Sequence, residues 1–268
     1  MSLFKLEEKI NSQIYRMFNV LSDGVFLTRQ DVWKKVKKNK AFYGIHAGQR
    51  CFIAATGPSF GNLSKAQLEA LQCEVVFGVN SFYKAPLAEG IVPSYYVLMD
   101  NNYWGLSSDT YKQVFKKYIG DPPVFVTDYR ALRFLPEGAK AIPLYAKNYP
   151  VRRMRDRLDR NASITMNVVG FAILTAIYMG FKEIYLLGSD YNLFCQQKGN
   201  HCYDDRDEFS QAPKYSLAFY LKDYHLATKF HYLLAKLAKE KNIRIVNLSE
   251  GSLLDAYPIA NASEVFGN

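Results

Sequence analysis

Short apolar runs alternate with amphipathic segments along most of this 268-residue chain. Several runs are continuous, which is typical of strands buried on both faces of a parallel sheet. These runs cover residues 51–55, 73–79, 95–99, 124–126, 183–187 and 243–246. Apolar positions at helical spacing predict helices between them, at residues 64–71, 101–118, 165–179 and 223–241. The alternation predicts an α/β fold with a mostly parallel, doubly wound sheet of the Rossmann-like kind.

The first 48 residues stand apart from this alternation. Leu6, Ile10 and Ile14 lie at the spacing of an amphipathic helix, and a second helical stretch runs to about residue 40. We therefore expect residues 1–48 to form an N-terminal helical extension that packs on the main domain or contacts a partner. Residues 49–268 then form the main domain.

One long segment inside the main domain lacks periodicity, at about residues 192–222. A loop of this length in a compact domain is usually a functional lid or a disordered segment. We expect a lid over the site.

The formal net charge of +9 favours anionic partners. Five lysines between residues 34 and 40 form one basic cluster, and five arginines between residues 152 and 160 form another. No helix-turn-helix pattern, zinc-finger spacing or RNA-binding signature accompanies them, so nucleic acid is not the expected partner. Attraction to an acidic membrane surface, or solubility alone, explains the clusters better. The oligomeric state stays open, with a homo-oligomer as one alternative.

The cellular compartment follows from what the sequence lacks. No apolar run is long enough to span a bilayer, and the chain does not begin with a signal peptide. The four cysteines are too few and too irregularly spaced for a disulfide framework. We expect a cytoplasmic protein, with peripheral contact to the inner face of the cytoplasmic membrane as an extension of that view.

Small and polar residues follow the first predicted strand. In an open parallel sheet, ligands bind outside the carboxyl ends of the strands, where the loops converge. There Thr56 precedes Gly57, which permits close backbone approach, Pro58, which fixes the turn, and Ser59, which offers a hydroxyl to a phosphate or ribose. The amides that begin the following helix point to the same place and favour an anion.

Three further strand ends carry residues of the same kind. They are Asn80 and Ser81, then Asp100 and Asn101, and finally Gly188, Ser189 and Asp190. A structural sheet needs turns at these positions, but it does not need this repeated choice of small, amide and carboxylate residues. We expect these residues to bind one phosphate-bearing ligand together with the first turn.

Common nucleotide and metal signatures are absent from the sequence. There is no G-x-x-x-x-G-K-[ST] loop and no G-x-G-x-x-G turn. Asp100 and Asp190 could together hold a divalent ion, but no Asp-x-Asp pair stands at a strand end. Cys195, His201 and Cys202 lack a convincing fourth ligand for zinc. The sequence predicts neither a metal nor another cofactor.

Two of the four histidines are candidates for a general base near neutral pH. His225 lies where the chain returns from the lid to the sheet edge, which favours it as the base. A capping or packing role for His225 stays the alternative. His231 lies deeper on the same predicted helix, where it could simply pack.

Four stretches of the sequence follow the order of motifs in one known family. They are Ile-Ala-Ala-Thr-Gly-Pro-Ser-Phe at 53–60, Val-Asn-Ser-Phe-Tyr at 79–83, Gly-Phe-Lys-Glu-Ile-Tyr-Leu-Leu-Gly-Ser-Asp-Tyr at 180–191 and Asn-Leu-Ser-Glu-Gly-Ser-Leu-Leu at 247–254. Together they resemble the bacterial sialyltransferases of glycosyltransferase family 42 and the related motility-accessory-factor domains. The resemblance covers about residues 50–258 and implies a GT-A variant of the Rossmann-like fold.

The resemblance also implies an activity. It implies a metal-independent glycosyltransferase that moves a nonulosonic acid, a sialic-acid-like sugar, from a CMP-activated donor to a glycan acceptor in lipooligosaccharide or surface-polysaccharide synthesis. His225 stands where the family's base belongs, and Ser163 and Thr165 lie near the family's donor-contacting turn. The family's tyrosines hold the leaving phosphate, and the candidates for them here are Tyr191, Tyr203 and Tyr215.

Two other functions stay open. A Gly-Pro-Ser start also occurs in domains that resemble an archaeal pterin diphosphokinase, which transfers pyrophosphate from ATP; Asp100 and Asp190 would then hold magnesium. The third function is a non-catalytic nucleotide-binding domain that uses its N-terminal helices as a contact surface.

Overall fold

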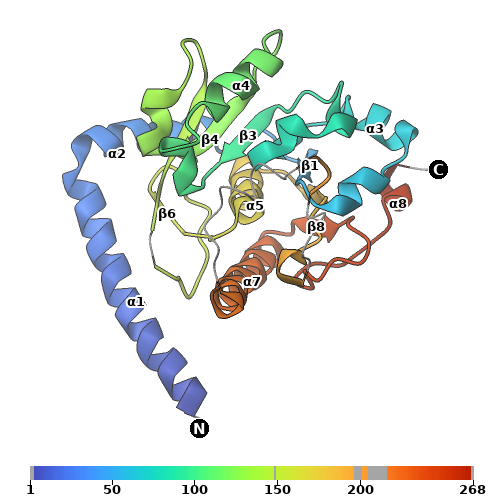
Figure 1. Ribbon diagram of the computed structural model, residues 1–268. Coiled ribbons are helices and arrows are strands. Elements are labelled where there is room, and N and C mark those ends of the chain that lie inside the picture. Colours follow the sequence, from blue (N-terminus) through green and yellow to red (C-terminus); the bar gives the residue numbers. More distant parts are fainter. Residues whose placement is uncertain (1–2, 148, 196–200, 205–215, 267–268) are drawn as a thin grey trace.

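One parallel sheet organises the part of the chain that the structure describes, residues 3–147, 149–195, 201–204 and 216–266. In this computed structural model those residues form eight strands, and every pair of neighbouring strands runs parallel (Figure 1). The strands are β1 (Arg50–Ala54), β2 (Val76–Val79), β3 (Tyr95–Leu98), β4 (Val124–Asp128), β5 (Ala141–Ala146), β6 (Asn161–Ala162), β7 (Glu183–Leu187) and β8 (Arg244–Asn247). The predicted α/β fold with a parallel sheet is confirmed.

Helices cover both faces of the sheet. They are α1 (Leu3–Thr28), α2 (Gln30–Lys37), α3 (Lys65–Leu71), α4 (Thr110–Lys117), α5 (Val168–Met179), α7 (Leu217–Glu240) and α8 (Ser263–Phe266). The helices α5 and α7 belong to the buried cluster on one face, and α3, α4 and α8 contribute to the cluster on the other. Because α5 contacts both the sheet and α7, every residue from Val169 to Met179 is buried and the helix has no polar face.

The strand order contains one reversal. It reads β6-β5-β4-β3-β2-β1-β7-β8, so the chain moves outward from β1 to β6 and then returns through α5 to place β7 beside β1. Loops leave β1 and β7 in opposite directions at this point. In open α/β sheets such a switch point produces a crevice beyond the carboxyl ends of the strands, and ligands bind there.

The N-terminal helices pack on the sheet edge formed by β5 and β6. Phe26, Val32 and Val36 form a small buried cluster against tyrosines of the main domain. The buried Asn39 side chain donates two hydrogen bonds of 2.8 Å, to the carbonyls of Pro143 and Leu158. The boundary at residue 48 remains a prediction, but the helices before it are fastened by specific polar contacts.

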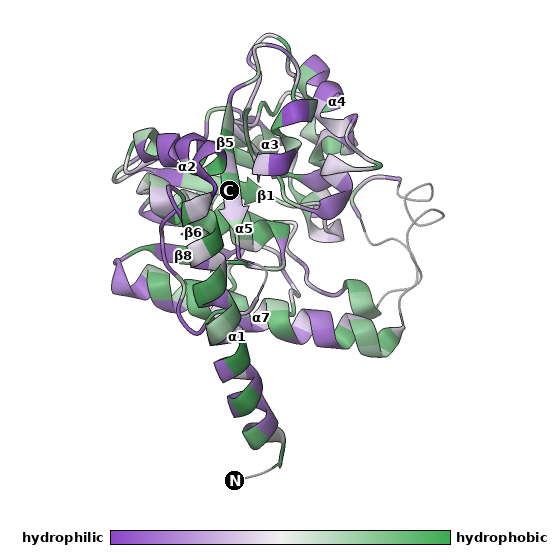
Figure 2. Cartoon of the chain, turned by 90° about the vertical axis from the view of Figure 1, so that its left-hand side faces the viewer, coloured by the Kyte–Doolittle hydropathy of each residue, from purple (hydrophilic) through white to green (hydrophobic). Residues whose placement is uncertain are grey.

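The first helix also presents an exposed apolar face. Its hydrophobic and hydrophilic residues alternate along the helix, which extends away from the body of the molecule (Figures 1 and 2). Leu6, Ile10 and Ile14 on this face are all exposed. Among the described residues, no helix combines the length and the apolar character that a membrane crossing requires.

Several predicted elements differ from those observed. The predicted helix at 101–118 is a short 3-10 turn at Asn101–Trp104 followed by α4, because Gly105 interrupts the helical backbone. β5, β6 and α8 were not predicted. The last part of the predicted lid is helical, since α7 begins at Leu217, while lid residues 196–200 and 205–215 lie outside the described residues.

The backbone segments that follow β1 and β7 lie so close together that a side chain at Gly57 or Gly188 would clash with the other segment. The amide of Gly57 donates to the carbonyl of Gly188 at 2.9 Å, which continues the strand pairing beyond both strands. Gly188 has a φ of +64°, and a Cβ atom added there would lie 2.5 Å from the carbonyl oxygen of Ala55. Only glycine satisfies both the backbone angle and the contact.

Replacing Gly188 by alanine should therefore destabilise the fold. We expect Gly188→Ala to lower the free energy of unfolding by about 2–4 kcal/mol, from left-handed strain and the clash with Ala55. Gly138→Ala is the matched control, because Gly138 also has a positive φ of +79° but no atom lies within 4 Å of an added Cβ. It should cost only about 1–2 kcal/mol. Urea denaturation of the two variants checks this, and equal losses would contradict the close approach.

Candidate functional site

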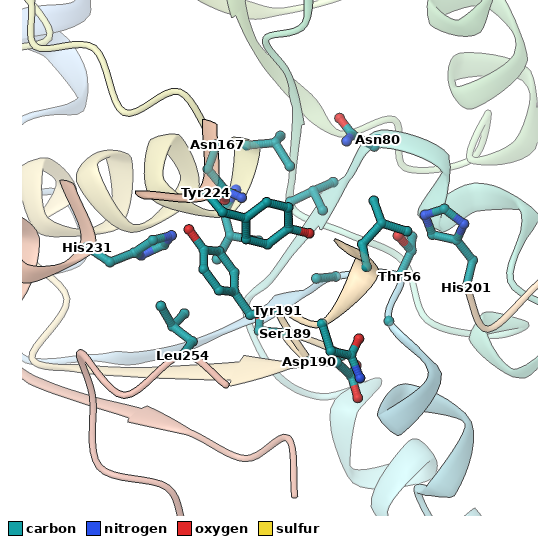
Figure 3. Close-up of a pocket in the computed structure, with 18 residues that line it drawn as sticks. Thr56, Asn80, Asn167, Ser189, Asp190, Tyr191, His201, Tyr224, His231 and Leu254 are labelled. Atoms are coloured by element: carbon teal, nitrogen blue, oxygen red, sulfur yellow. The ribbon is translucent and has the colours of Figure 1, made fainter. Parts of the chain in front are cut away.

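A pocket of about 170 Å³ opens at the switch point, beyond the carboxyl ends of β1, β2 and β7 (Figure 3). The start of α5 and residues of α7 complete its wall. Six residues predicted from the strand ends line it, and so does Tyr191, which the resemblance suggested; the six are Thr56, Gly57, Asn80, Gly188, Ser189 and Asp190. The structure thus brings together residues from three separate strand ends.

Other predicted residues lie outside this lining. They are Pro58, Ser59, Ser81, Asp100, Asn101, Ser163, Thr165, Tyr203 and His225. Tyr215 falls outside the described residues. The third strand end contributes nothing to the pocket, because Asp100 is exposed and its carboxylate accepts a hydrogen bond of 2.9 Å from the amide of Asn102, capping the 3-10 turn.

The turn after β1 holds a carboxylate of the protein itself. The Ser59 amide donates to Asp190 Oδ1 at 3.2 Å, and the Ser59 hydroxyl donates to Asp190 Oδ2 at 2.9 Å. A Cβ atom on Gly57 would lie 2.0 Å from the same Oδ2. The expectation that Ser59 faces a ligand phosphate is therefore corrected: the anion at this turn is Asp190. Burial raises the pKa of Asp190, and the hydrogen bonds from Ser59 oppose that shift.

The motif at 247–254 fixes the end of β7. The Ser249 hydroxyl accepts from the Ser189 amide at 2.7 Å, and the Ser252 hydroxyl donates to the Ser189 carbonyl at 2.6 Å. Asn247 Nδ2 in turn donates to the Ser252 oxygen at 2.9 Å. These three residues are buried, and the sequence analysis gave them no role. They position the pocket wall.

The N-terminus of α5 points into the pocket. Asn167, Val168 and Val169 line it, and Asn167 caps the helix by accepting from the amides of Val169 (2.9 Å) and Gly170 (3.3 Å). Among the described residues that line the pocket there is no Lys or Arg, so the positive end of the helix dipole is the main described feature that favours an anion there.

Ser163 and Thr165 do not reach this pocket. Thr165 is fully buried, and its hydroxyl donates to the carbonyl of Asn167 at 2.8 Å. Ser163 is also buried and borders a different cavity, beside α1. Thr165 therefore supports the α5 cap, and the residue of this segment that reaches the pocket is Asn167.

Strained backbone and unpartnered polar atoms occur together at the pocket. Asn80 and Tyr191 have φ values of 47° and 57°, and left-handed non-glycine residues are enriched at functional sites. Asn80 Oδ1 and Ser189 Oγ are buried and have no hydrogen-bond partner among the described residues. A bound ligand with hydrogen-bonding groups would satisfy both atoms.

Two tyrosines stand on the α7 side of the pocket (Figure 3). The rings of Tyr191 and Tyr224 pack edge to face with their centroids 4.9 Å apart. The Tyr191 hydroxyl accepts from Thr228 at 3.2 Å, and burial raises the pKa of Tyr191 to about 12. Burial raises the pKa of Tyr224 as well. Both hydroxyls therefore stay protonated at neutral pH and can donate to an anion. Tyr224 was not predicted.

His231 presents an unpartnered nitrogen to the same pocket. Its Nδ1 lies 3.0 Å from the Tyr257 hydroxyl, and that hydroxyl donates its one proton to the His231 carbonyl at 3.3 Å. When the hydroxyl donates to this carbonyl, Nδ1 carries the imidazole proton and Nε2 keeps a lone pair. This Nε2 is buried and has no hydrogen-bond partner among the described residues. Burial lowers the pKa of His231 from 6.5 to about 3.

His225 lies away from the pocket. Its side chain is 52% exposed on α7, and its Nε2 is 4.0 Å from a carboxylate oxygen of Glu8 on α1. The structure thus gathers Gly57, Asn80 and Asp190 as expected but leaves His225 outside. Its predicted role as base is untested, and His231 is the histidine of α7 that lines the site.

One described piece of the lid reaches the pocket. His201 lines it and stacks on Tyr203, with ring centroids 5.0 Å apart. The amide of Cys202 donates to the Thr56 carbonyl at 2.8 Å, which attaches this segment to the turn after β1. Within the described ranges, no three His, Cys, Asp or Glu side chains group closely enough to hold a metal ion. The expected independence from metals stays a prediction.

The buried state of His231 predicts a pH dependence of stability. The pKa of His231 is lowered in the folded state, so below about pH 6.5 the unfolded chain binds more protons than the folded chain. The free energy of unfolding therefore decreases as the pH is lowered through this window. We expect the loss attributable to His231 to reach about 2 kcal/mol between about pH 7.5 and about pH 5. His231→Gln should remove this part of the dependence, whereas His225→Gln should retain it. Denaturant titrations at several pH values measure the difference, and equal slopes in wild type and His231→Gln would contradict it.

Comparisons with known proteins place this site in context. A structure of the MAf glycosyltransferase from Magnetospirillum magneticum AMB-1 is similar over 86% of this chain, with a TM-score of 0.51 and 12% identity, and the chain spans 38% of that protein's length. The sialyltransferase CstII from Campylobacter jejuni, solved in complex with cytidine-5'-monophosphate, is similar over 81% of this chain and 86% of its own, with a TM-score of 0.50 and 16% identity. These likenesses show a shared fold.

No curated protein matches the sequence. The model of one family matches residues 27–194, more than half of the chain, which therefore belongs to the 6-hydroxymethylpterin diphosphokinase MptE-like family.

Proposed function

We propose that this protein is a glycosyltransferase that moves a nonulosonic acid from a CMP-activated donor to a glycan acceptor. One observation carries the proposal: the N-terminus of α5 and His231 line the same pocket at the switch point of the sheet, and the His231 Nε2 has no hydrogen-bond partner among the described residues. The first suits the phosphate of the donor, and the second suits the proton of an attacking hydroxyl.

The donor phosphate would lie at the N-terminus of α5. Asn80 and Ser189 offer their unpartnered oxygens to the hydroxyls and amide groups of the ligand. The cavity of about 170 Å³ is smaller than the roughly 300–1,000 Å³ of a typical ligand pocket, so it encloses only part of a sugar nucleotide. The remainder would lie over the open rim.

His231 would act as the general base. Above its lowered pKa the imidazole is neutral, and in the tautomer with the proton on Nδ1 the lone pair on Nε2 can accept a proton. Burial weakens its basicity in the empty pocket. A negatively charged donor close to the ring would raise the pKa again, because an opposite charge favours the imidazolium. The base would therefore be strongest when donor is bound.

Tyr191 and Tyr224 would stabilise the departing nucleotide. As glycosyl transfer proceeds, negative charge builds on the CMP phosphate, and fixed donors aimed at that charge lower the barrier. Both hydroxyls remain protonated, as their raised pKa values require. The complex of CstII with cytidine-5'-monophosphate supports the same nucleotide here, since the two proteins share a fold.

The family description favours a second candidate function, pyrophosphate transfer from ATP to a pterin. That chemistry uses magnesium held by carboxylates. Asp190 is the one carboxylate in the described pocket lining, and it already accepts hydrogen bonds from the amide and the hydroxyl of Ser59. The geometry therefore supports glycosyl transfer better.

Binding and turnover assays separate the two candidates. Isothermal titration should detect CMP, while ATP with Mg²⁺ should bind more weakly. Release of CMP from CMP-sialic acid and related nonulosonate donors, measured with galactoside acceptors, then tests transfer. His231→Ala should slow CMP release by at least about 100-fold, as expected for a lost general base.

His225→Ala is the matched control on the same helix, and its rate should stay within about threefold of wild type. If His225→Ala abolished release while His231→Ala did not, the assignment of the base would be overturned. Tight binding of ATP with Mg²⁺ together with pterin pyrophosphorylation, and no CMP release from any nonulosonate donor, would overturn the proposed reaction.

A further inference from the structure

A larger cavity of about 960 Å³ lies between α1 and the segment that leads to and follows β6. Both of these elements are visible on the same side of the molecule (Figure 1). Eight basic and two acidic side chains line it, so six of the nine net positive charges of the chain gather around one groove. The fold brings Lys37, from the lysine cluster, to the same cavity as the five arginines at 152–160.

Some of these charges are neutralised within the protein. Lys147 pairs with Asp23 at 2.8 Å, and Arg157 pairs with Asp159 at 2.8 Å. By contrast, Arg16, Arg155 and Arg160 have no ion-pair or hydrogen-bond partner in the described part of the chain. Three guanidinium groups around one cavity form a site for an anion, because each can bind phosphate or carboxylate oxygens in a bidentate manner.

The cavity wall also contains hydrogen-bond acceptors. Asn19 is 7% exposed, and its Nδ2 donates to the Pro150 carbonyl at 3.0 Å, which leaves its Oδ1 without a partner among the described residues. Asn161 Nδ2 donates to Asp23, and its Oδ1 is likewise buried and unpartnered in the described structure. Buried amide oxygens require donors. A ligand that carries both hydroxyls and negative charge would satisfy the amides and the arginines together.

The groove and the nucleotide pocket share one chain segment. Ser163 borders the groove and Asn167 borders the pocket. They are four positions apart in the sequence, and four steps of extended chain span at most about 14 Å. A short oligosaccharide bound in the groove can therefore place one of its hydroxyls near the pocket.

We infer that this groove binds the anionic part of the acceptor, and that the acceptor is an acidic, phosphate-bearing saccharide. The inference rests on the proposed glycosyl transfer and names its acceptor class. The apolar face of α1, with Leu6, Ile10 and Ile14, is a separate exposed surface and plays no part in it.

Titration of the whole chain with defined saccharides tests this. Maltotriose 6-phosphate should bind at least about 10-fold more tightly than maltotriose at low salt, and added salt should weaken it. The double variant Arg155→Gln/Arg160→Gln should lose most of that preference. Arg133→Gln, an exposed arginine that does not line the groove, is the matched control and should keep it.

Three results would overturn the inference. These are equal binding of the phosphorylated and neutral saccharides, an unchanged preference in the double variant, and tighter binding of inorganic phosphate or of a short RNA than of the phosphosaccharide. CMP binding is measured on the same proteins and should be unaffected by the double variant. If the wild-type protein did not bind CMP, the proposed donor would be refuted, while the saccharide titration would still test the groove.

Discussion

The hydrogen bonds from Ser59 to the Asp190 carboxylate hold the site together. They join the turn after β1 to the turn after β7, at the switch point where the loops that follow these two strands run in opposite directions. Gly57 and Gly188 must lack side chains for this contact to form, because an added Cβ would strike Asp190 in one case and Ala55 in the other. The turn that looks like a phosphate-binding loop in the sequence is therefore filled by the protein's own anion. In the proposed function, a ligand phosphate would instead lie at the N-terminus of α5.

The fold was predictable because most of its strands are continuous apolar runs. This pattern can be recognised in the sequence without knowing how the side chains pack. β5 escaped prediction because Pro143 stands in its centre, and Pro is unusual within a strand. β6 comprises only two residues, Asn161–Ala162. Thr56, Gly57, Asn80, Gly188, Ser189 and Asp190 line one pocket, as the sequence predicts, since parallel strands deliver their carboxyl ends to one edge. Their role in binding a donor stays a prediction.

The positions of the two histidines on α7 have a geometric cause. His225 and His231 are six positions apart, which places them about 120° apart around the helix axis. The buried face of α7 contains Ala227, His231, Leu234 and Ala238, at helical spacing, and this series includes His231 but not His225. The signal was present in the apolar pattern around His231. Tyr224 and the roles of Ser249 and Ser252 depend on how distant segments meet, so no local pattern could have revealed them.

The two basic clusters illustrate the same limit. The sequence shows them more than 100 residues apart and suggests a diffuse attraction to anionic surfaces. The structure places Lys37 and the arginines around one cavity beside α1, within reach of the pocket. Much of the positive charge is therefore gathered at one cavity, and α1 and α2 both contribute to its lining. The described lining of the proposed donor pocket has no Lys or Arg, whereas the proposed acceptor groove is rich in both, so each substrate would have its own binding place.

A crystal structure of the protein with CMP bound tests the central claim most directly. The account predicts the CMP phosphate within hydrogen-bonding distance of the first amides of α5, with Asn80 and Ser189 in contact with the ligand and Ser59 still bound to Asp190. Density for CMP in the arginine-lined groove, or a phosphate that displaces Asp190 from Ser59, would contradict it.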